Sequence, residues 1–251
     1  MSTQTLSRQR SSSNQTLPRA LRRGLAVPTG VLGLLVMLGG LQLFTAGIAH
    51  YQASAFITHW EKQRSQPSEQ AWQVAADAIN RAIKHHPAAN GTYLEKRGYI
   101  YQWQHADAAL DEPTALASRH AAVQAQREAT QARPTWPDAW AALAYAKLSV
   151  LEFDDEFTHA LQQAQHFGPW RIGINRRIAE IGLTALAVLN TEQTAVIFTA
   201  AQRTAQYSVN ERKWLFALAQ ETKHLAALCQ ALTQPYPECA ALSKPETPQH
   251  E

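Results

Sequence analysis

The densest group of side chains that could take part in catalysis is an acidic cluster, formed by Glu152, Asp154, Asp155 and Glu156. Two carboxylates about 5–10 Å apart are enough for glycoside hydrolysis. The same residues also precede a helical apolar pattern, and acidic groups at a helix N-terminus are stabilised by the exposed N–H groups and the helix dipole. Because this second role requires no substrate, we interpret the cluster as a helix start.

The ten histidines do not form a recognisable metal site. His85 and His86 are adjacent, whereas histidines that bind one metal ion from a helix normally lie three or four positions apart. The sequence also has no HExxH motif, nucleophile elbow or glycine-rich phosphate loop. We therefore predict that the protein is not an enzyme and needs no metal or cofactor. A glycan-processing enzyme that uses the acidic cluster is the alternative from another functional class.

Positive charge is concentrated at the N-terminus. Residues 1–23 contain five arginines and no acid. Since the whole chain has a net charge of +3, the remaining residues have a net charge of −2. A slightly acidic body lacks the basic surface that nucleic-acid binding requires. We expect no nucleic-acid partner, and we expect residues 1–23 to form a disordered basic tail.

An apolar segment follows this tail. Residues 24–49 contain no Lys, Arg, Asp or Glu, and as a helix they would be about 39 Å long, against about 30 Å for the hydrocarbon core of a bilayer. We predict one transmembrane helix with a cytoplasmic N-terminus, because arginine-rich flanks stay in the cytoplasm. A cleaved signal peptide with a site at Ala53 to Ala55 is the alternative, although its apolar region is usually about 7–15 residues long.

The two cysteines, Cys229 and Cys239, fit this topology. A pair of cysteines in an exported domain is typical of a disulfide. The alternative is that one or both are buried thiols. Their spacing matches neither a CxxC redox motif nor a zinc knuckle.

The rest of the chain has a helical pattern. We expect a juxtamembrane extension over residues 50–67, a helical domain over residues 68–234 and a proline-rich tail over residues 235–251. Within the domain, Ser68 is expected to begin one helix, and Ser208 with Glu211 forms a capping-box pattern at another. Sustained period-2 alternation is absent, which predicts an all-α fold.

An internal repeat is visible in the helix ends. Three times an alanine late in an expected helix is followed five positions later by a proline that ends the helix, at Pro87, Pro134 and Pro169. The second interval, 35 residues, is close to the 34-residue period of tetratricopeptide hairpins, and the first interval, 47 residues, would match if the segment "HADAALDEP" is an insertion. The segment "ARPTWPDAW" is then a joint between hairpins, with Trp136 and Trp140 filling the wedge between them.

These residues resemble the tetratricopeptide-repeat superfamily over about residues 68–170. Leu94, Gly98 and Tyr101 fall at pattern positions of one hairpin, and Trp140, Leu143 and Ala144 at those of the next, whereas Arg97 and Lys147 depart from the pattern. The resemblance implies an α-solenoid of hairpins with a concave groove that binds a partner protein. The groove positions that it implies are Thr92, Glu95, Tyr99, Gln102, Asp138, Ala141, Tyr145 and Leu148.

A narrower resemblance comes from the N-terminal anchor combined with "RPTWPDAWAALAYAK" and "FGPW". This combination is similar to the VpsP-like family of bacterial exopolysaccharide biosynthesis proteins. The resemblance implies an adaptor in the inner membrane with a periplasmic domain, whose partners are protein components of a polysaccharide polymerase or export assembly. The alternative is a module that binds exported polypeptides during envelope or cytochrome assembly.

Overall fold

The computed structural model describes residues 19–240, and within this range the chain is helical and contains no strand. The basic tail up to residue 18 and the proline-rich tail from residue 241 lie outside the described residues. The helices are α1 (Arg19–Gln63), α2 (Glu69–His85), α3 (Gly91–Trp103), α4 (Leu116–Ala132), α5 (Pro137–Ser149), α6 (Asp155–Phe167), α7 (Ile172–Ala185), α8 (Thr191–Tyr207), α9 (Val209–Glu221), α10 (Leu225–Ala231) and α11 (Pro237–Ala240), with short 3₁₀ turns η1 (Pro113–Ala115) and η2 (Leu186–Val188).

Side-chain caps set several of these helix starts. The Ser68 hydroxyl accepts a hydrogen bond from the Ala71 N–H at 3.3 Å, which places the start of α2 as expected. At α9 only half of the expected capping box forms, because the Ser208 hydroxyl accepts from the Glu211 N–H while the Glu211 carboxylate faces Arg176 at 3.3 Å. A complete capping box is found instead at α8, between Asn190 and Gln193.

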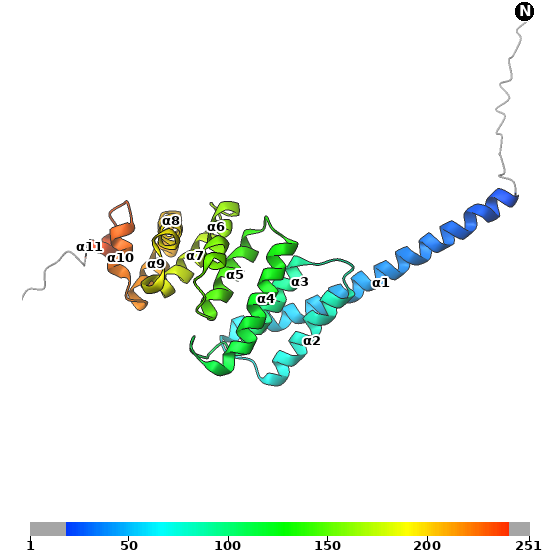
Figure 1. Ribbon diagram of the computed structural model, residues 1–251, viewed down its shortest axis with the longest axis horizontal. Helices are drawn as coiled ribbons and strands as arrows, with labels where there is room; N and C mark the ends of the chain where they lie inside the picture. The colour runs from blue at the N-terminus through cyan, green and yellow to red at the C-terminus, as the bar shows by residue number, and fades with distance from the viewer. Residues whose placement is uncertain (1–18, 241–251) are drawn as a thin grey trace, which may run out of the picture.

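Helices that are consecutive along the chain pack in pairs. The pairs are the second half of α1 with α2, then α3 with α4, α5 with α6, α7 with α8, and α9 with α10. The odd-numbered helices also contact one another in the order α1, α3, α5, α7 and α9, and α6 contacts α8. The odd-numbered helices therefore form a continuous layer along an elongated body, with α1 at one end and α10 and α11 at the other (Figure 1).

Helix α1 has two parts with different surroundings. From Val31 to Phe44 its large apolar side chains are exposed, whereas Ala46, Ala49, Ala53, Ile57 and Trp60 are buried against α2 and α3. The buried residues are spaced three or four apart, so they form one face of the helix. The packed region therefore begins within α1, before the domain boundary that we expected at Ser68.

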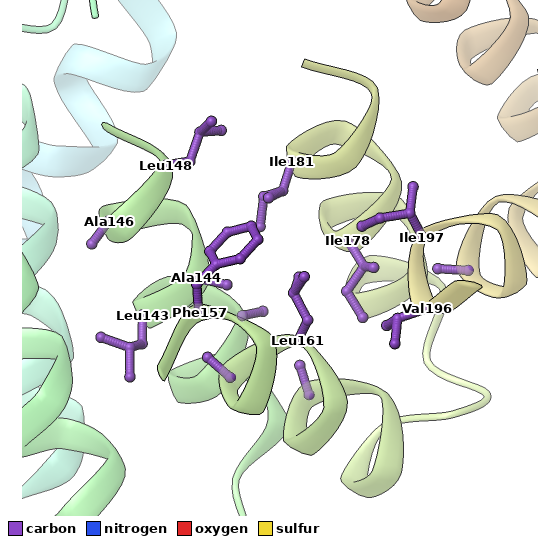
Figure 2. Packing of buried hydrophobic residues seen from close by; sticks show 14 of the residues in the cluster. Leu143, Ala144, Ala146, Leu148, Phe157, Leu161, Ile178, Ile181, Val196 and Ile197 are labelled. Carbon is purple, nitrogen blue, oxygen red and sulfur yellow. The ribbon is translucent and has the colours of Figure 1, made fainter. Parts of the chain in front are cut away.

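Both within and between the pairs, the core depends on close approach of helices. Figure 2 shows the apolar cluster in which Phe157 and Leu161 of α6 lie with Ile178 and Ile181 of α7. A methyl group added to Gly182 of α7 would lie 2.2 Å from the Ile197 side chain of α8, a distance at which atoms overlap. Glycine at this position allows α7 and α8 to pack closely.

The last helices are joined covalently. Cys229 of α10 and Cys239 of α11 form a disulfide, with a distance of 5.6 Å between their Cα atoms. Both residues pack against the apolar cluster formed by α7, α8 and α9. The disulfide therefore holds the end of the described chain against the helical body.

Candidate functional site

A pocket of about 320 Å³ lies on the layer of odd-numbered helices. Three successive helices of this layer, α3, α5 and α7, contribute to it, together with the last turn of α1, the loop 104–112 and the start of α4. This volume is within the range of ligand-binding pockets. The residues that line the pocket include Glu61, Tyr99, Gln102, Trp103, Leu110, Arg119, Tyr145 and Arg177.

Two tyrosines at equivalent predicted positions meet in this pocket. Tyr99 comes from α3 and Tyr145 from α5, and the guanidinium carbon of Arg177 lies 5.0 Å from the centre of the Tyr145 ring. Burial raises the pKa of Tyr99 to about 12, and burial also raises the pKa of Tyr145. Both phenols are therefore neutral near pH 7 and can donate hydrogen bonds.

The loop 104–112 forms one wall of the pocket. It corresponds to the segment expected to be an insertion, and Ala108 and Leu110 line the cavity. Arg119 of α4 holds it, because its guanidinium donates hydrogen bonds to the Leu110 carbonyl at 2.7 Å and to the Ala108 carbonyl at 2.9 Å. The long first interval of the repeat is the sequence signal for this wall.

The other predicted groove residues lie outside this pocket. Thr92 and Glu95 both face Arg133, whose guanidinium donates to the Thr92 hydroxyl at 2.8 Å and lies 3.8 Å from the Glu95 carboxylate. Asp138 accepts a hydrogen bond from Arg171 at 2.7 Å.

The two aliphatic members of the predicted set, Ala141 and Leu148, are 3% and 5% exposed and belong to the apolar core. Of the eight predicted positions, the structure therefore brings Tyr99, Gln102 and Tyr145 into one pocket.

The joint between α4 and α5 also differs from expectation. Trp136 does not fill a wedge between hairpins, since it is 40% exposed. Its ring lies against two guanidinium groups, those of Arg133 at 4.2 Å and Arg171 at 5.2 Å. Trp140 is partly buried against the apolar core, and its indole N–H donates to the Pro134 carbonyl at 2.7 Å.

The acidic cluster surrounds a buried lysine. The Lys147 ammonium has no exposed side-chain surface and donates hydrogen bonds to Glu152, Asp154 and Glu156, each at 2.9 Å. Asp154 also caps α6, accepting from the Phe157 N–H at 3.0 Å. Three of the four acids therefore stabilise the turn between α5 and α6, in addition to the helix start that we expected.

Arg127 of α4 extends this network. Its guanidinium donates two hydrogen bonds to the Glu156 carboxylate, at 2.6 and 2.7 Å. These bonds from Arg127, with the bond from Lys147, lower the pKa of Glu156 to about 2 despite partial burial. The pKa of Lys147 is raised, because its three carboxylate partners outweigh its desolvation.

Three residues of the pocket are not evident from the sequence pattern. Spacing does not link them to the tyrosines, because they lie at a helix start (Arg119), at a helix end (Trp103) and in α7, outside the region of resemblance (Arg177). The ion-pair network of Lys147 does have a sequence signal. A lysine stands alone in an alanine-rich helical segment, and acidic residues follow it five, seven and nine positions later. Among residues 19–240, no group of three or more His, Cys, Asp or Glu side chains is arranged to hold a metal ion.

Helix α1 contains the one candidate membrane span among the described residues. Over Pro28–Gln63 this helix is long and apolar enough to cross a bilayer.

Comparisons with protein-family models, with curated proteins and with solved structures found no match for this chain.

Proposed function

We propose that this protein is a membrane-anchored, non-catalytic adaptor that binds a partner polypeptide on its layer of odd-numbered helices. The observation that carries the proposal is the pocket in which Tyr99 of α3, Tyr145 of α5 and Arg177 of α7 meet. Side chains from three successive helices on one surface are typical of repeat proteins, which bind extended ligands along a concave face. Tyrosine and arginine are also the residues most enriched at the energetic centres of protein interfaces.

The packing of consecutive helices in pairs supports a tetratricopeptide-like solenoid as the scaffold for this surface. In such an array each pair contacts its neighbours, and the contacts among α3, α5, α7 and α9 follow that order. Gly98 supports the repeat pattern, because a methyl group there would lie 2.2 Å from the Gln126 amide of α4.

The membrane anchor in this proposal is the first part of α1. Pro28 to Thr45 are 18 residues, about 27 Å of helix, close to the thickness of a hydrocarbon core. Large apolar side chains in this part, including Leu32, Val36 and Met37, are 62–67% exposed, which is unfavourable in water and favourable in lipid. The helical domain would then begin immediately outside the bilayer, in the periplasm if the arginines remain in the cytoplasm.

For the pathway, we propose exopolysaccharide biosynthesis or export, on the resemblance to the VpsP-like family. A non-catalytic role agrees with the acidic cluster, since Glu152, Asp154 and Glu156 are all bound to Lys147. The partner would be a protein of the polymerase or export assembly.

A photo-crosslinking amino acid placed at Tyr145 of the full-length protein in its native membrane tests the proposal. We expect a crosslink to a specific polypeptide from Tyr145 and none from the control position Tyr207, which is 62% exposed at the end of α8. The substitutions Tyr99→Ala and Tyr145→Ala together should prevent copurification of that polypeptide and reduce exopolysaccharide output. A crosslink from Tyr207 but not from Tyr145 would contradict the proposal.

A further inference from the structure

The pocket contains several donor groups that make no hydrogen bond to another residue within the range 19–240. The Gln102 amide nitrogen is buried and unpaired. The hydroxyl groups of Tyr99 and Tyr145 and the guanidinium of Arg177 also make no hydrogen bond to another described residue. Buried polar groups are normally paired, so the unpaired Gln102 amide indicates a ligand that carries a hydrogen-bond acceptor. The donors of Tyr99, Tyr145 and Arg177 are accessible from the pocket and can bind the same ligand.

Among the side chains that line the cavity, positive charge exceeds negative charge, which favours an anionic ligand. Arg119 and Arg177 line it with a single carboxylate, that of Glu61, which is exposed at the end of α1. Both ends of the Arg119 guanidinium are occupied by backbone carbonyls, so this group contributes charge but is not free to bind. The Nε atom of Arg177 lies 3.9 Å from the Glu180 carboxylate, whereas its two terminal nitrogens make no hydrogen bond to a described residue and can bind an anion.

The remaining walls suit a peptide segment. The aromatic rings of Tyr99, Tyr145 and Trp103 and the Leu110 side chain provide apolar surface, and the volume of about 320 Å³ is suited to one or two side chains. Aromatic residues around a charged group are typical of peptide-binding surfaces.

We propose that this pocket binds a carboxylate group of an acidic segment in the partner polypeptide, with Arg177 as the charged contact and Gln102, Tyr99 and Tyr145 as hydrogen-bond donors. This inference rests on the proposed function, since it takes a polypeptide as the ligand. A guanidinium can donate two parallel hydrogen bonds to one carboxylate, which makes such pairs strong and directional.

Calorimetric titration of the full-length protein in detergent micelles tests this inference, with pentaglutamate, pentaglutamine and tetragalacturonate as probes. We expect pentaglutamate to bind and pentaglutamine not to bind. Arg177→Gln should weaken pentaglutamate binding by at least about tenfold, the effect of losing one charge-assisted hydrogen bond. Thermal unfolding of each variant checks that the helices remain folded.

Arg176→Gln is the matched control, because Arg176 is the preceding residue of α7 and contacts Glu211 and Trp214 outside the pocket. It should leave pentaglutamate binding unchanged. Equal losses in both variants, equal affinity for both peptides, or no binding of any probe up to about 10 mM would overturn the inference. Binding of tetragalacturonate alone, dependent on Arg177, would assign the pocket to an acidic glycan instead.

Crosslinking from Tyr145 in the Arg177→Gln background separates the two proposals. If the crosslink to a polypeptide persists at full strength, the adaptor function stands and the carboxylate inference fails. If no crosslink forms even in the wild type, the adaptor function itself fails.

Discussion

At the scale of single residues, Lys147 is the most constrained group in the described chain. Its side chain is fully buried, and its three carboxylate partners remain 32–54% exposed. The ammonium has lost its hydration, and only these three hydrogen bonds replace it. The network therefore depends on the lysine more than on any one of the acids.

Replacing Lys147 with methionine should destabilise the protein by about 3 kcal/mol, because it removes one partner of a buried ion-pair network. The loss is at the low end for such changes, since the three carboxylates can still reach water. Urea unfolding of the full-length protein in micelles, followed by circular dichroism, measures it. Lys84→Met, at an exposed position of α2, is the control and should change the midpoint little.

The lowered pKa of Glu156 predicts how the stability of the fold depends on pH. Because Arg127 and Lys147 lower its pKa from 4.5 to about 2, the folded protein binds fewer protons than the unfolded chain between these values. The stabilisation is therefore complete above pH about 5 and is lost as the pH falls toward 2. The unfolding midpoint of the wild type should fall more steeply between pH 5 and pH 3 than that of Glu156→Gln. Parallel slopes would show that Glu156 is not responsible.

At the scale of helices and loops, two glycines of α7 have opposite surroundings. Gly182 faces Ile197 across the contact with α8, whereas a methyl group added to Gly173 would meet nothing within 4 Å. Because both glycines lie on the same helix, comparing an alanine substitution at each position separates the effect of helix packing from that of helix propensity.

Gly182→Ala should destabilise the protein by about 1–3 kcal/mol, because the new methyl group overlaps the branched Ile197 side chain. Gly173→Ala should be neutral or stabilising by up to about 1 kcal/mol, since alanine favours helix and nothing obstructs it. The thermal unfolding midpoints of the two variants, each compared with that of the wild type, test both expectations. A Gly182→Ala protein as stable as the wild type would mean that α7 and α8 can separate without cost.

The loop 104–112 should depend on Arg119. Arg119→Gln removes the guanidinium that binds the Ala108 and Leu110 carbonyls, so the loop should open more often and become a site of proteolysis. Limited digestion with a nonspecific protease should then cut between residues 104 and 112. Arg171→Gln, which breaks an exposed ion pair, is the control and should leave that loop protected. Equal resistance in both variants would show that the wall is held by other contacts.

At the scale of the whole molecule, α1 connects two environments. Its first part carries exposed apolar side chains, and its second part is packed against α2 and α3. Because the helix is continuous, the orientation of the helical domain is coupled to that of the anchor. A rigid connection of this kind would hold the pocket at a defined distance from the bilayer.

The proposed topology, with a periplasmic C-terminal domain, rests on the arginines that precede the apolar part of α1. Green fluorescent protein fused after Glu251 should remain dark, because it does not become fluorescent after export in an unfolded state, and alkaline phosphatase at the same position should be active. Because export has opposite effects on the two reporters, each fusion serves as the control for the other. A fluorescent fusion with inactive phosphatase would reverse the topology and place Cys229 and Cys239 in a reducing compartment.

Local chemistry explains what was predictable from the sequence alone. The helical class follows from the spacing of apolar residues, and several helix starts follow from caps such as Ser68, since a cap needs only neighbours a few positions away. The long apolar helix is evident from composition, because no charged residue occurs from Gly24 to Trp60. The resemblance to the repeat pattern placed Tyr99, Tyr145 and Gln102 on one surface, and these three residues line one pocket in the structure, while their role in binding stays a prediction.

Contacts between distant residues were decided only by the tertiary structure. Arg177 meets Tyr145 and Arg119 holds the wall because α3, α4, α5 and α7 pack in a particular order, and short-range spacing does not encode that order. Burial is equally nonlocal: Leu148 is in the core and Trp136 at the surface because of the neighbouring helices, not because of their own types. The pocket is therefore a property of the packing, built partly by a loop that the sequence pattern shows only as an interruption of the repeat.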